Sequence, residues 1–564
     1  MVAKLHSSKT GLWRSLAAAV LGMGLAAGCG GGGDDAGDGD EVPVPASVQT
    51  GRVAVQDAGS GLPDRWYAKG AFMEINVRAY QDSDGDGVGD LNGVTQKLDY
   101  LKDLGVTGLW LMPINRTDDH DSGYIVTDHR SVETEYGSLD DVRTLLAEAH
   151  TRGIGVILDY VPNHSADTDP LFVNAASSRH AAYRDWYLIT ASQPTDWVTW
   201  SGKVPWYKVA TGFYYASFNE GMPDFNWLNR DVVEYHKNNL RFWLNLGVDG
   251  FRLDAVSRLV EGGPQDTDGR PESQALVREL QDVVHEYRNR YLVCEDGTHP
   301  DATAAASVCG SAFAFGLNED LRKLARGDTA GLGALATSLT QRPLARMGTL
   351  LANHDRFAGL RLMDEFNGDE TSYRLAAASL LTLPGIPFIY YGEEVGMRGM
   401  PLADFDAGSD WPLRGPMSWA AQPTVTRNTR VGPYDYFQPA PNIGERNVAQ
   451  AAQDSASLWN FYRRLLSLRR DTPALREGDF NLLAVGTTAL AYERRLGNES
   501  VIVAINYGSV ASALSLPALV SGRHYASELA QGANAVALDT AASGASTGLS
   551  LPGRSAQVFR ATLP

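Results

Sequence analysis

The chain has 564 residues, of which 44% are hydrophobic and 21% are charged, as is ordinary for a globular protein. This length allows a large catalytic domain with one or two smaller domains. The formal net charge of −18 argues against binding to the phosphate backbone of nucleic acids. An uncharged ligand needs no electrostatic steering, so the net charge does not identify the class of ligand.

The N-terminus has the pattern of an export signal. A basic stretch contains Lys4, Lys9 and Arg14. Residues 16–27 are apolar but too few to span a bilayer. The run ends in Leu25-Ala26-Ala27-Gly28-Cys29, which resembles a bacterial lipobox. That resemblance implies loss of residues 1–28 and lipidation of Cys29; the alternative is an ordinary cleaved signal peptide with an incidental cysteine.

A lipid on Cys29 would be the protein's only contact with a membrane. We expect an exported lipoprotein at the outer membrane, the cell surface or the periplasmic face of a Gram-negative bacterium. Gly30 in place of Asp after the cysteine favours the outer membrane. Residues 29–60 are polar, aperiodic and at first Gly/Asp-rich, which predicts a flexible tether.

From residue 66 onward, apolar runs typical of strands alternate with helical patterns, which indicates βα units and a parallel sheet. The candidate strands are 72–77, 108–112, 156–160, 250–254, 291–295, 312–315, 349–353 and 386–391. Helical spacing is found in 139–152, 232–246, 273–290, 373–383 and 455–469. Ser138 followed by Asp141 predicts a capping box before the first of these helices. The pattern predicts an α/β protein with a (β/α)8 TIM barrel over 61–164 and 222–474.

Two further regions accompany the barrel. Residues 165–221, after the third strand, are rich in Trp, Tyr, Pro and Asp and are predicted to form an inserted domain beside the C-terminal ends of the strands. Residues 475–564 carry short strand-like runs, such as 489–494, 500–506 and 556–560, which predict a C-terminal antiparallel β-sandwich. Cys294 and Cys309 form either a disulfide or two buried thiols.

Three carboxylates, those of Asp254, Glu295 and Asp355, follow short apolar runs. An acid just past a buried strand is costly to desolvate and so calls for a function. The C-terminal strand ends form the active-site face of a TIM barrel, and three acids there favour glycoside hydrolysis. Arg252 shares a strand face with Asp254 and would keep that carboxylate ionised. The apolar run before Glu295 would raise its pKa, as a general acid requires.

Four segments carry a likeness to a known family. They are Asp159-Tyr160-Val161-Pro162-Asn163-His164, residues 247–256 around Asp254, the segment ending at Glu295, and Asn353-His354-Asp355. In this order they resemble the conserved blocks of the α-amylase family of retaining glycoside hydrolases (glycoside hydrolase family 13).

The resemblance implies a role for each matching residue. Asp254 would be the nucleophile, Glu295 the general acid/base, and Asp355 a stabiliser of the transition state. His164 and His354 would hydrogen-bond the sugar, and Tyr124 would stack on it, while Arg252 would pair with the nucleophile. Trp197, Trp200, Trp206 and Tyr207 of the insertion either stack on sugar rings or pack that domain's own core.

Specificity is indicated by Met222-Pro223-Asp224-Phe225-Asn226, which resembles the group intermediate between oligo-1,6-glucosidases and neopullulanases. The segments 385–394 and 414–419 resemble the oligo-1,6-glucosidase side. We therefore expect cleavage of α-1,4, and also α-1,6, bonds of malto-oligosaccharides and short α-glucans by a monomer. The alternatives are a transglycosylase or isomerase such as a trehalose synthase, and a non-catalytic surface protein that binds glycans.

A metal site is indicated in the segment after the first strand. Asp82, Asp84, Asp86 and Asp90, with the Val88 carbonyl, alternate with glycines and offer the oxygen ligands that a hard cation prefers. The segment is not an EF-hand, because Gly93 stands where a bidentate Glu would be needed. Related enzymes often hold Ca2+ here, so we expect a structural Ca2+; the alternative is an acidic turn without an ion.

Overall fold

The computed structural model describes residues 40–118, 122–199, 202–401, 409–427, 437–517, 519, 522–540 and 546–562. The predicted export signal, Cys29 and Trp200 lie outside these residues. The described chain belongs to one compact unit that spans Gly39–Pro564. None of its described helices is both long enough and apolar enough to cross a membrane.

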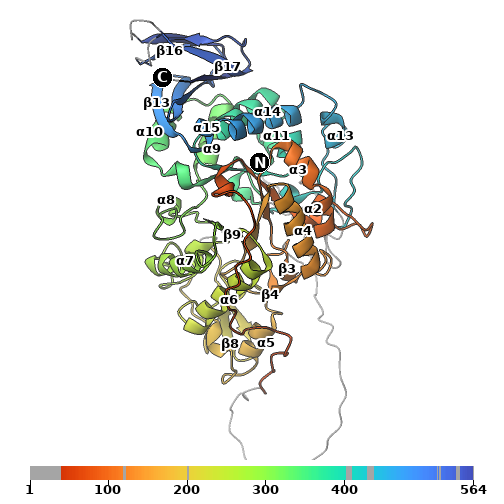
Figure 1. Cartoon of the computed structure of the whole chain (residues 1–564). Helices are drawn as coiled ribbons and strands as arrows, with labels where there is room; N and C mark the ends of the chain where they lie inside the picture. The colour runs from red at the N-terminus through yellow and green to blue at the C-terminus, as the bar shows by residue number, and fades with distance from the viewer. Residues whose placement is uncertain are drawn as a thin grey trace, which may run out of the picture. The chain divides into compact units, whose positions relative to one another are not determined.

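A parallel barrel forms the centre of this unit (Figure 1). Its strands occur in the spatial order β10-β9-β5-β2-β1-β12-β11. Their bounds are β1 Phe72–Ile75, β2 Gly108–Leu111, β5 Gly155–Tyr160, β9 Gly250–Leu253, β10 Tyr291–Cys294, β11 Gly348–Thr349 and β12 Ile386–Tyr390. Between β10 and β11, single parallel bridges join Ala312 to Cys294 and Phe313 to Gly348. The predicted strand 312–315 is thus present as these two bridges, which complete the ring.

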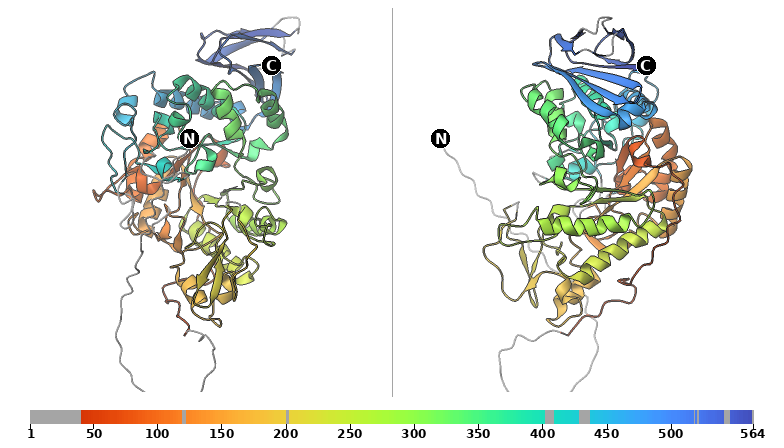
Figure 2. Two further views of the ribbon diagram at one scale, coloured as in Figure 1. Left: turned by 180° about the vertical axis from the view of Figure 1, so that it is seen from behind. Right: turned by 60° about the vertical axis from the view of Figure 1, so that its left-hand side comes forward.

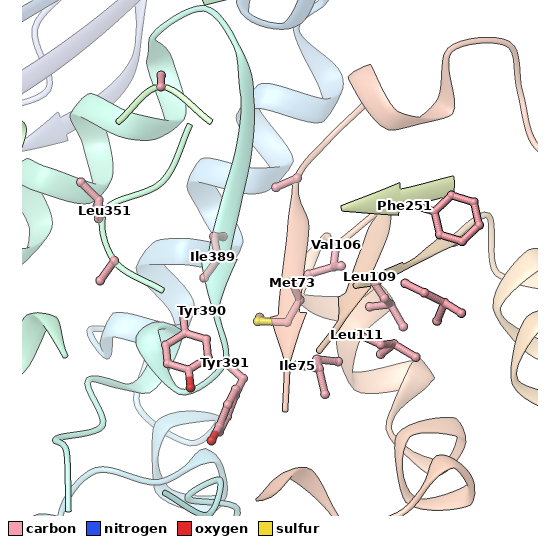
Figure 3. Close-up of a cluster of buried hydrophobic side chains, with 14 of the residues drawn as sticks. Met73, Ile75, Val106, Leu109, Leu111, Phe251, Leu351, Ile389, Tyr390 and Tyr391 are labelled. Atoms are coloured by element: carbon pink, nitrogen blue, oxygen red, sulfur yellow. The ribbon is translucent and has the colours of Figure 1, made fainter. Parts of the chain in front are cut away.

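Alternating residues of each strand serve two cores, as the twofold period of a strand requires. Phe72, Trp110 and Phe388 fill the barrel interior. Met73 and Leu109 point outward into the layer between strands and helices, as Figure 3 shows. Gly108 is small because a Cβ there would lie 2.5 Å from the Phe72 ring. The strands are therefore buried on both faces, which explains their continuous apolar runs.

Helices cover the outside of the barrel. They include α3 Leu98–Leu104, α4 Leu139–Thr151, α6 Arg230–Leu246, α7 Pro271–Val284, α9 Leu317–Ala325, α10 Leu332–Gln341, α12 Glu370–Thr382 and α14 Leu458–Asp471. The capping box of Ser138 and Asp141 is confirmed at the start of α4. At the end of α6, Gly247 takes a left-handed conformation with φ 112°, which favours glycine. This turn leads the chain into β9, the strand that carries Arg252.

The insertion forms a small domain of its own. Helix α5 Pro170–Ser177 accompanies a three-stranded sheet of β6 Ile189–Thr190, β8 Gly212–Tyr215 and β7 Trp206–Val209. Trp197, Trp206 and Tyr215 meet edge to face, with ring centroids 5.2–5.5 Å apart. Tyr207 packs on Tyr214. Trp206 and Tyr215 are buried in the core of the insertion, whereas Trp197 and Tyr207 are half-buried against their neighbours. Packing within the insertion is thus present for these side chains, and stacking on sugar rings stays a prediction.

The C-terminal region is antiparallel, as predicted. A six-stranded sheet has the order β13-β14-β15-β20-β17-β18, and β16 pairs with β19. The bounds are β13 Asp479–Val485, β14 Ala489–Leu496, β15 Glu499–Asn506, β16 Ser512–Leu516, β17 His524–Gln531, β18 Leu538–Asp539, β19 Thr547–Leu551 and β20 Ser555–Thr562. Both sheets bury side chains in one shared cluster. The Tyr492 hydroxyl lies 2.6 Å from Thr382 Oγ1, so this region packs on α12.

The flexible tether predicted for residues 29–60 is wrong for its described part. Residues 40–60, which we call the N-terminal strap, lie along α6 toward α5 (Figure 2). Asn238 of α6 accepts from the Val53 N–H at 2.8 Å, and Asn174 of α5 donates to the Val42 carbonyl at 2.7 Å. Val44 and Val48 of the strap also pack against the main hydrophobic core. The composition suggested disorder because two such residues and a set of polar contacts leave no periodic hydrophobic pattern in the sequence.

Candidate active site

The predicted acids lie at the C-terminal ends of the barrel strands. Asp254 directly follows β9, and Glu295 directly follows β10. Asp355 comes several residues after the end of β11, which stops at Thr349 rather than continuing to residue 353 as expected. A disulfide between Cys294 and Cys309 ties the end of β10 to the segment that leads to Ala312. Of the two alternatives for these cysteines, the structure has the disulfide.

Arg252 holds the first two acids together. Its Nη1 donates to Asp254 Oδ1 at 2.6 Å, and its Nη2 donates to Glu295 Oε2 at 2.7 Å. The Arg252 side chain is 1% exposed. The sequence predicted its pairing with Asp254, whereas its contact with Glu295 is visible only in the structure. One guanidinium thus fixes two carboxylates side by side, with a donor fork suited to that task.

Asp159 completes the surroundings of Arg252. Arg252 Nη1 also donates to Asp159 Oδ1 at 2.8 Å. Asp159 Oδ2 accepts from Tyr124 Oη at 2.8 Å and from Trp110 Nε1 at 3.1 Å. Sequence reasoning missed Asp159 as a site residue, although it opens one of the four segments that resemble the family's blocks. The available signal was a carboxyl group inside the fully buried run of β5.

His354 connects Asp355, the third acid, to Glu74 of strand β1. Its Nδ1 lies 2.5 Å from Glu74 Oε1, and its Nε2 lies 3.1 Å from Asp355 Oδ2 and 2.6 Å from Tyr124 Oη. Burial lowers the pKa of His354, but Asp355 and Glu74 outweigh this effect and raise it to about 10. His354 is therefore a cation at neutral pH, with both ring nitrogens donating.

Asp355 is correspondingly held ionised. Burial opposes its charge, but the His354 cation and Arg414 keep the pKa of Asp355 well below its ordinary range. Arg414 Nη2 donates to Asp355 Oδ1 at 3.1 Å. Glu74 and Arg414 were both missed by sequence reasoning. Glu74 could have been noticed as a single acid inside the apolar run of β1.

The predicted binding residues gather around the acids. Tyr124 stacks on His354, with ring centroids 5.3 Å apart and planes 11° apart. His164 Nε2 lies 3.1 Å from the Tyr124 carbonyl, and burial lowers the pKa of His164 to about 4. His164 is therefore neutral, in contrast to His354. The structure thus brings together all the predicted residues of this site: Asp254, Glu295, Asp355, Tyr124, His164, Arg252 and His354.

Burial acts in the same direction on both central acids, Glu295 and Asp254. Burial raises the pKa of Glu295 to about 7; Arg252 opposes this rise, and the charges of Asp254 and Asp355 add to it. Burial also raises the pKa of Asp254, while Arg252 offsets part of that effect. Ala255, which has a left-handed φ of 45°, donates its N–H to Glu295 Oε2 at 3.0 Å. Glu295 can therefore serve as a proton donor near neutral pH, and Arg252 supplies the positive charge that favours the ionised form of Asp254.

The acidic segment after β1 forms a compact cluster. Oxygens of Asp82, Asp84 and Asp86 lie within 4.8 Å of one another. The loop is shaped by Asp82, whose Oδ1 accepts from the Gly85 N–H at 2.7 Å and whose Oδ2 accepts from Gly87 at 2.9 Å. Hard carboxylate oxygens at this spacing fit a Ca2+ ion.

Asp90 has a different environment from this cluster. It caps helix α2 Leu91–Gln96, accepting from Gly93 at 2.7 Å, and it accepts from the Ser83 N–H at 2.8 Å. Asp90 and the Val88 carbonyl therefore stay predictions as ligands.

Comparisons with known proteins agree with this geometry. A family model described as the α-amylase catalytic domain matches residues 74–478. Alpha-amylase 3 of Dictyoglomus thermophilum is 34% identical over 462 residues, covering 80% of this chain and 87% of that protein. Oligo-1,6-glucosidase of Parageobacillus thermoglucosidasius is 29% identical over 533 residues, covering 80% and 92%. Trehalose synthase/amylase TreS of Mycolicibacterium smegmatis is 32% identical over 494 residues, covering 76% and 81%.

Solved structures share the fold. The crystal structure of an α-amylase from H. orenii matches with a TM-score of 0.74 at 30% identity, covering 87% of this chain and 99% of that one. Isomaltulose synthase PalI from Klebsiella sp. LX3 matches with a TM-score of 0.73 at 26% identity, covering 88% and 99%.

Proposed function

This chain belongs to the α-amylase family, and on that basis we propose that it hydrolyses α-1,4, and also α-1,6, bonds of malto-oligosaccharides and short α-glucans with retention of configuration. It is an enzyme of the α-amylase/α-glucosidase type. The observation that carries the proposal is the fork of Arg252, which holds Asp254 at 2.6 Å and Glu295 at 2.7 Å. A fixed pair of carboxylates, one protonated and one ionised, is what glycoside hydrolysis requires.

In the first step, the ionised Asp254 attacks the anomeric carbon of the glucose. The bond from that carbon to the glycosidic oxygen breaks, and Glu295 gives its proton to the leaving oxygen. A glycosyl ester on Asp254 results. The pKa of Glu295, about 7, suits this transfer because the group is still largely protonated just below neutral pH.

In the second step, water attacks the anomeric carbon of the ester. The Glu295 carboxylate takes the proton from that water, and the bond to Asp254 breaks. Two inversions give net retention. Asp355 would grip sugar hydroxyls through the step, and the positive charge of His354 beside it would keep that carboxylate ionised.

The subsite for the non-reducing-end sugar that is released would be lined by Tyr124, His164 and His354. Tyr124 is fixed by its contact with Asp159 and by stacking on His354. Asp82, Asp84 and Asp86, joined by Asp90 and the Val88 carbonyl, would hold a Ca2+ ion. The ion would stabilise the loop that follows β1 by neutralising its mutually repelling carboxylates.

Transglycosylation or isomerisation is the second candidate. The relative from M. smegmatis is named as a trehalose synthase/amylase, and the same glycosyl ester would serve both reactions. Only the acceptor that replaces water differs. A non-catalytic glycan-binding role is less consistent with the site, because all three acids and the pairing arginine are in place.

The test is product analysis of residues 40–564, purified as a soluble protein, on maltotetraose, isomaltose, pullulan and starch. An Asp254→Asn variant is the control. Proton NMR of the first product should show the α anomer, and a β anomer would refute retention. If the wild type instead turns concentrated maltose into an isomer, the second candidate is favoured. If neither protein acts on any of these sugars, the glycan-binding alternative is favoured.

We also propose that the protein is an exported lipoprotein attached through Cys29. A Cys29→Ser variant should lose incorporation of labelled palmitate and leave the membrane fraction. Retention of the label in that variant would contradict lipidation at this residue, and recovery of the wild type in the inner membrane alone would contradict the outer-membrane location.

A further inference from the structure

Arg414 reaches Asp355 from a short segment whose own position has to be fixed. The 3-10 helix η8 Trp411–Arg414 ends at this arginine, and the Arg414 side chain is buried. Besides its contact with Asp355, Arg414 Nε donates to the His354 carbonyl at 3.3 Å. A 3-10 turn of four residues has few hydrogen bonds of its own. Other parts of the barrel must therefore hold the backbone around Arg414.

Two buried tyrosines bind the carbonyl groups on either side of Arg414. Tyr390, the last residue of β12, donates from Oη to the Leu413 carbonyl at 3.0 Å. Tyr391 donates from Oη to the Gly415 carbonyl at 2.5 Å. Figure 3 shows both side chains at the end of this strand. Burial raises the pKa of Tyr391 to about 12, so its hydroxyl keeps the proton that it donates.

Arg361 joins the two tyrosines to the same segment. It directly precedes helix α11 Leu362–Glu365. Its Nε donates to the Leu413 carbonyl at 2.9 Å, and its Nη1 donates to the Tyr391 carbonyl. Its guanidinium carbon lies 4.0 Å from the ring centroid of Tyr390 and 4.6 Å from that of Tyr391. Arg361 is only 3% exposed. A buried charge is costly unless it is bound, so these contacts account for its place in the core.

Two neighbouring strands support the two cations that contact Asp355. Strand β1 pairs with β12 in parallel, and Glu74 lies opposite Tyr390 in the register. Glu74 binds His354, whereas the tyrosine at the end of β12 binds the segment that carries Arg414. The two cations on Asp355 are therefore each fixed to the barrel from one of these strands.

Three buried side chains thus hold the segment of Arg414. They are Tyr390, Tyr391 and Arg361, and we call them the Arg414 support. We propose that the Arg414 support positions Asp355 for the reaction by holding Arg414 against its carboxylate. This inference deepens the proposed function and rests on it. With Arg414 in place, the carboxylate stays ionised and aligned for sugar hydroxyls. A displaced Arg414 would weaken stabilisation of the transition state and so lower kcat more than it raises KM.

The first test is a double-mutant cycle with maltotetraose as substrate. Tyr391→Phe removes one hydroxyl and keeps the ring. It should lower kcat/KM up to about tenfold, the usual worth of one hydrogen bond, mainly through kcat. In an Arg414→Gln background the same change should cost about twofold or less, because the residue that it positions is gone. Tyr492→Phe removes a similarly buried hydroxyl, which lies beside Thr382, and should leave kcat/KM unchanged in both backgrounds.

The second readout does not depend on any sugar. Hydrogen exchange of the peptide that covers residues 411–415 should be faster in Tyr391→Phe than in the wild type. Arg361→Lys should have the same effect, because lysine keeps the charge but lacks the planar fork that reaches both carbonyls. In Tyr492→Phe, which loses a comparable buried hydroxyl elsewhere, the exchange of this peptide should not change.

Each outcome bears on one of the two proposals. Unchanged exchange at 411–415 in Tyr391→Phe overturns the inference, as does a loss of kcat/KM that is just as large in the Arg414→Gln background. Faster exchange with unchanged kcat/KM also overturns it, because the placement of Arg414 would then not matter for the reaction. If the wild type does not hydrolyse maltotetraose, the proposed function fails and the effect on the reaction falls with it. The exchange measurement then still decides whether the Arg414 support holds this segment.

Discussion

His354 Nδ1 lies 2.5 Å from Glu74 Oε1, in a contact between residues 280 positions apart, and both side chains are 1% exposed. Glu74 lies inside β1, whereas His354 lies in the loop after β11. The charge of Glu74 adds to that of Asp355 in keeping the buried imidazole protonated. Glu74, which is not expected to contact the sugar, therefore helps to set the charge of His354, which is expected to contact it.

Glu74→Gln should weaken this arrangement. Without the Glu74 charge, the pKa of His354 falls from its value of about 10, and Asp355 loses part of the cation that keeps it ionised. We expect a lower kcat/KM across the pH profile; the basic limb itself belongs to Glu295, whose pKa of about 7 lies below that of His354. The measurement is the pH profile of kcat/KM on maltotetraose. Glu477→Gln, which removes an acid paired with Lys69, is the control, and identical profiles for both variants would contradict the role of Glu74.

The pH dependence should follow Glu295 and Asp254. Cleavage needs Glu295 protonated, so kcat/KM should fall as pH rises through about 7, the raised pKa of Glu295. At the acid side it should fall when Asp254 takes up a proton. With α-glucosyl fluoride, whose leaving group needs no proton, the basic limb should be much weaker. An equally steep basic limb for both substrates would argue against Glu295 as the acid.

Arg252→Lys should damage both activity and stability. A lysine keeps the charge but cannot reach Asp254, Glu295 and Asp159 with separate donors. Breaking a buried charge pair costs about 3–5 kcal/mol of folding stability. Because lysine retains the charge, the loss in unfolding free energy should be about 3 kcal/mol or less. Urea unfolding and kcat measure the two effects, with Arg230→Lys as a control at an exposed pair with Glu279. A variant with wild-type kcat would show that the fork is dispensable.

Removal of Ca2+ should lower the melting temperature. A bound ion at a hundred times its Kd stabilises the folded state by about 2.7 kcal/mol. EDTA should therefore destabilise the wild type, and added Ca2+ should restore it. In Asp84→Asn the response should be weaker, whereas Asp140→Asn, on the exposed face of α4, should respond as the wild type does. A wild type that is insensitive to EDTA would leave the loop as an acidic turn.

The N-terminal strap should contribute to stability. A chain that begins at residue 61 loses the acceptor for Arg130, whose Nη2 donates to the Gly51 carbonyl at 3.0 Å, and the donor for Asn238. A buried polar group left without a partner costs about 1–3 kcal/mol. The chain that begins at residue 40 is the matched reference. Equal unfolding free energies for these two proteins would mean that the strap only lies on the surface.

Much of the site was predictable because its chemistry is carried by short local patterns. Asp254, Glu295 and Asp355 stand beyond apolar runs, and parallel strands place such positions on one face of a barrel. Arg252 and Asp254 share a strand face for the same local reason. Glu74 and Arg414 could not be assigned in this way, because their roles depend on contacts with residues 280 and 59 positions away.

The same distinction applies to the fold. The periods of strands and helices predicted the order of the elements. They did not predict that the sixth strand consists of two single bridges, or that Asn238 and Asn174 bind the N-terminal strap. By itself the sequence determined the barrel, the three acids and the pairing of Arg252 with Asp254, since these depend on neighbours in the chain. Only the tertiary structure decided which charges share Arg252, that Cys294 meets Cys309, and which side chains hold the segment of Arg414. Burial and Coulomb interactions act through space, so residues far apart in the chain set them.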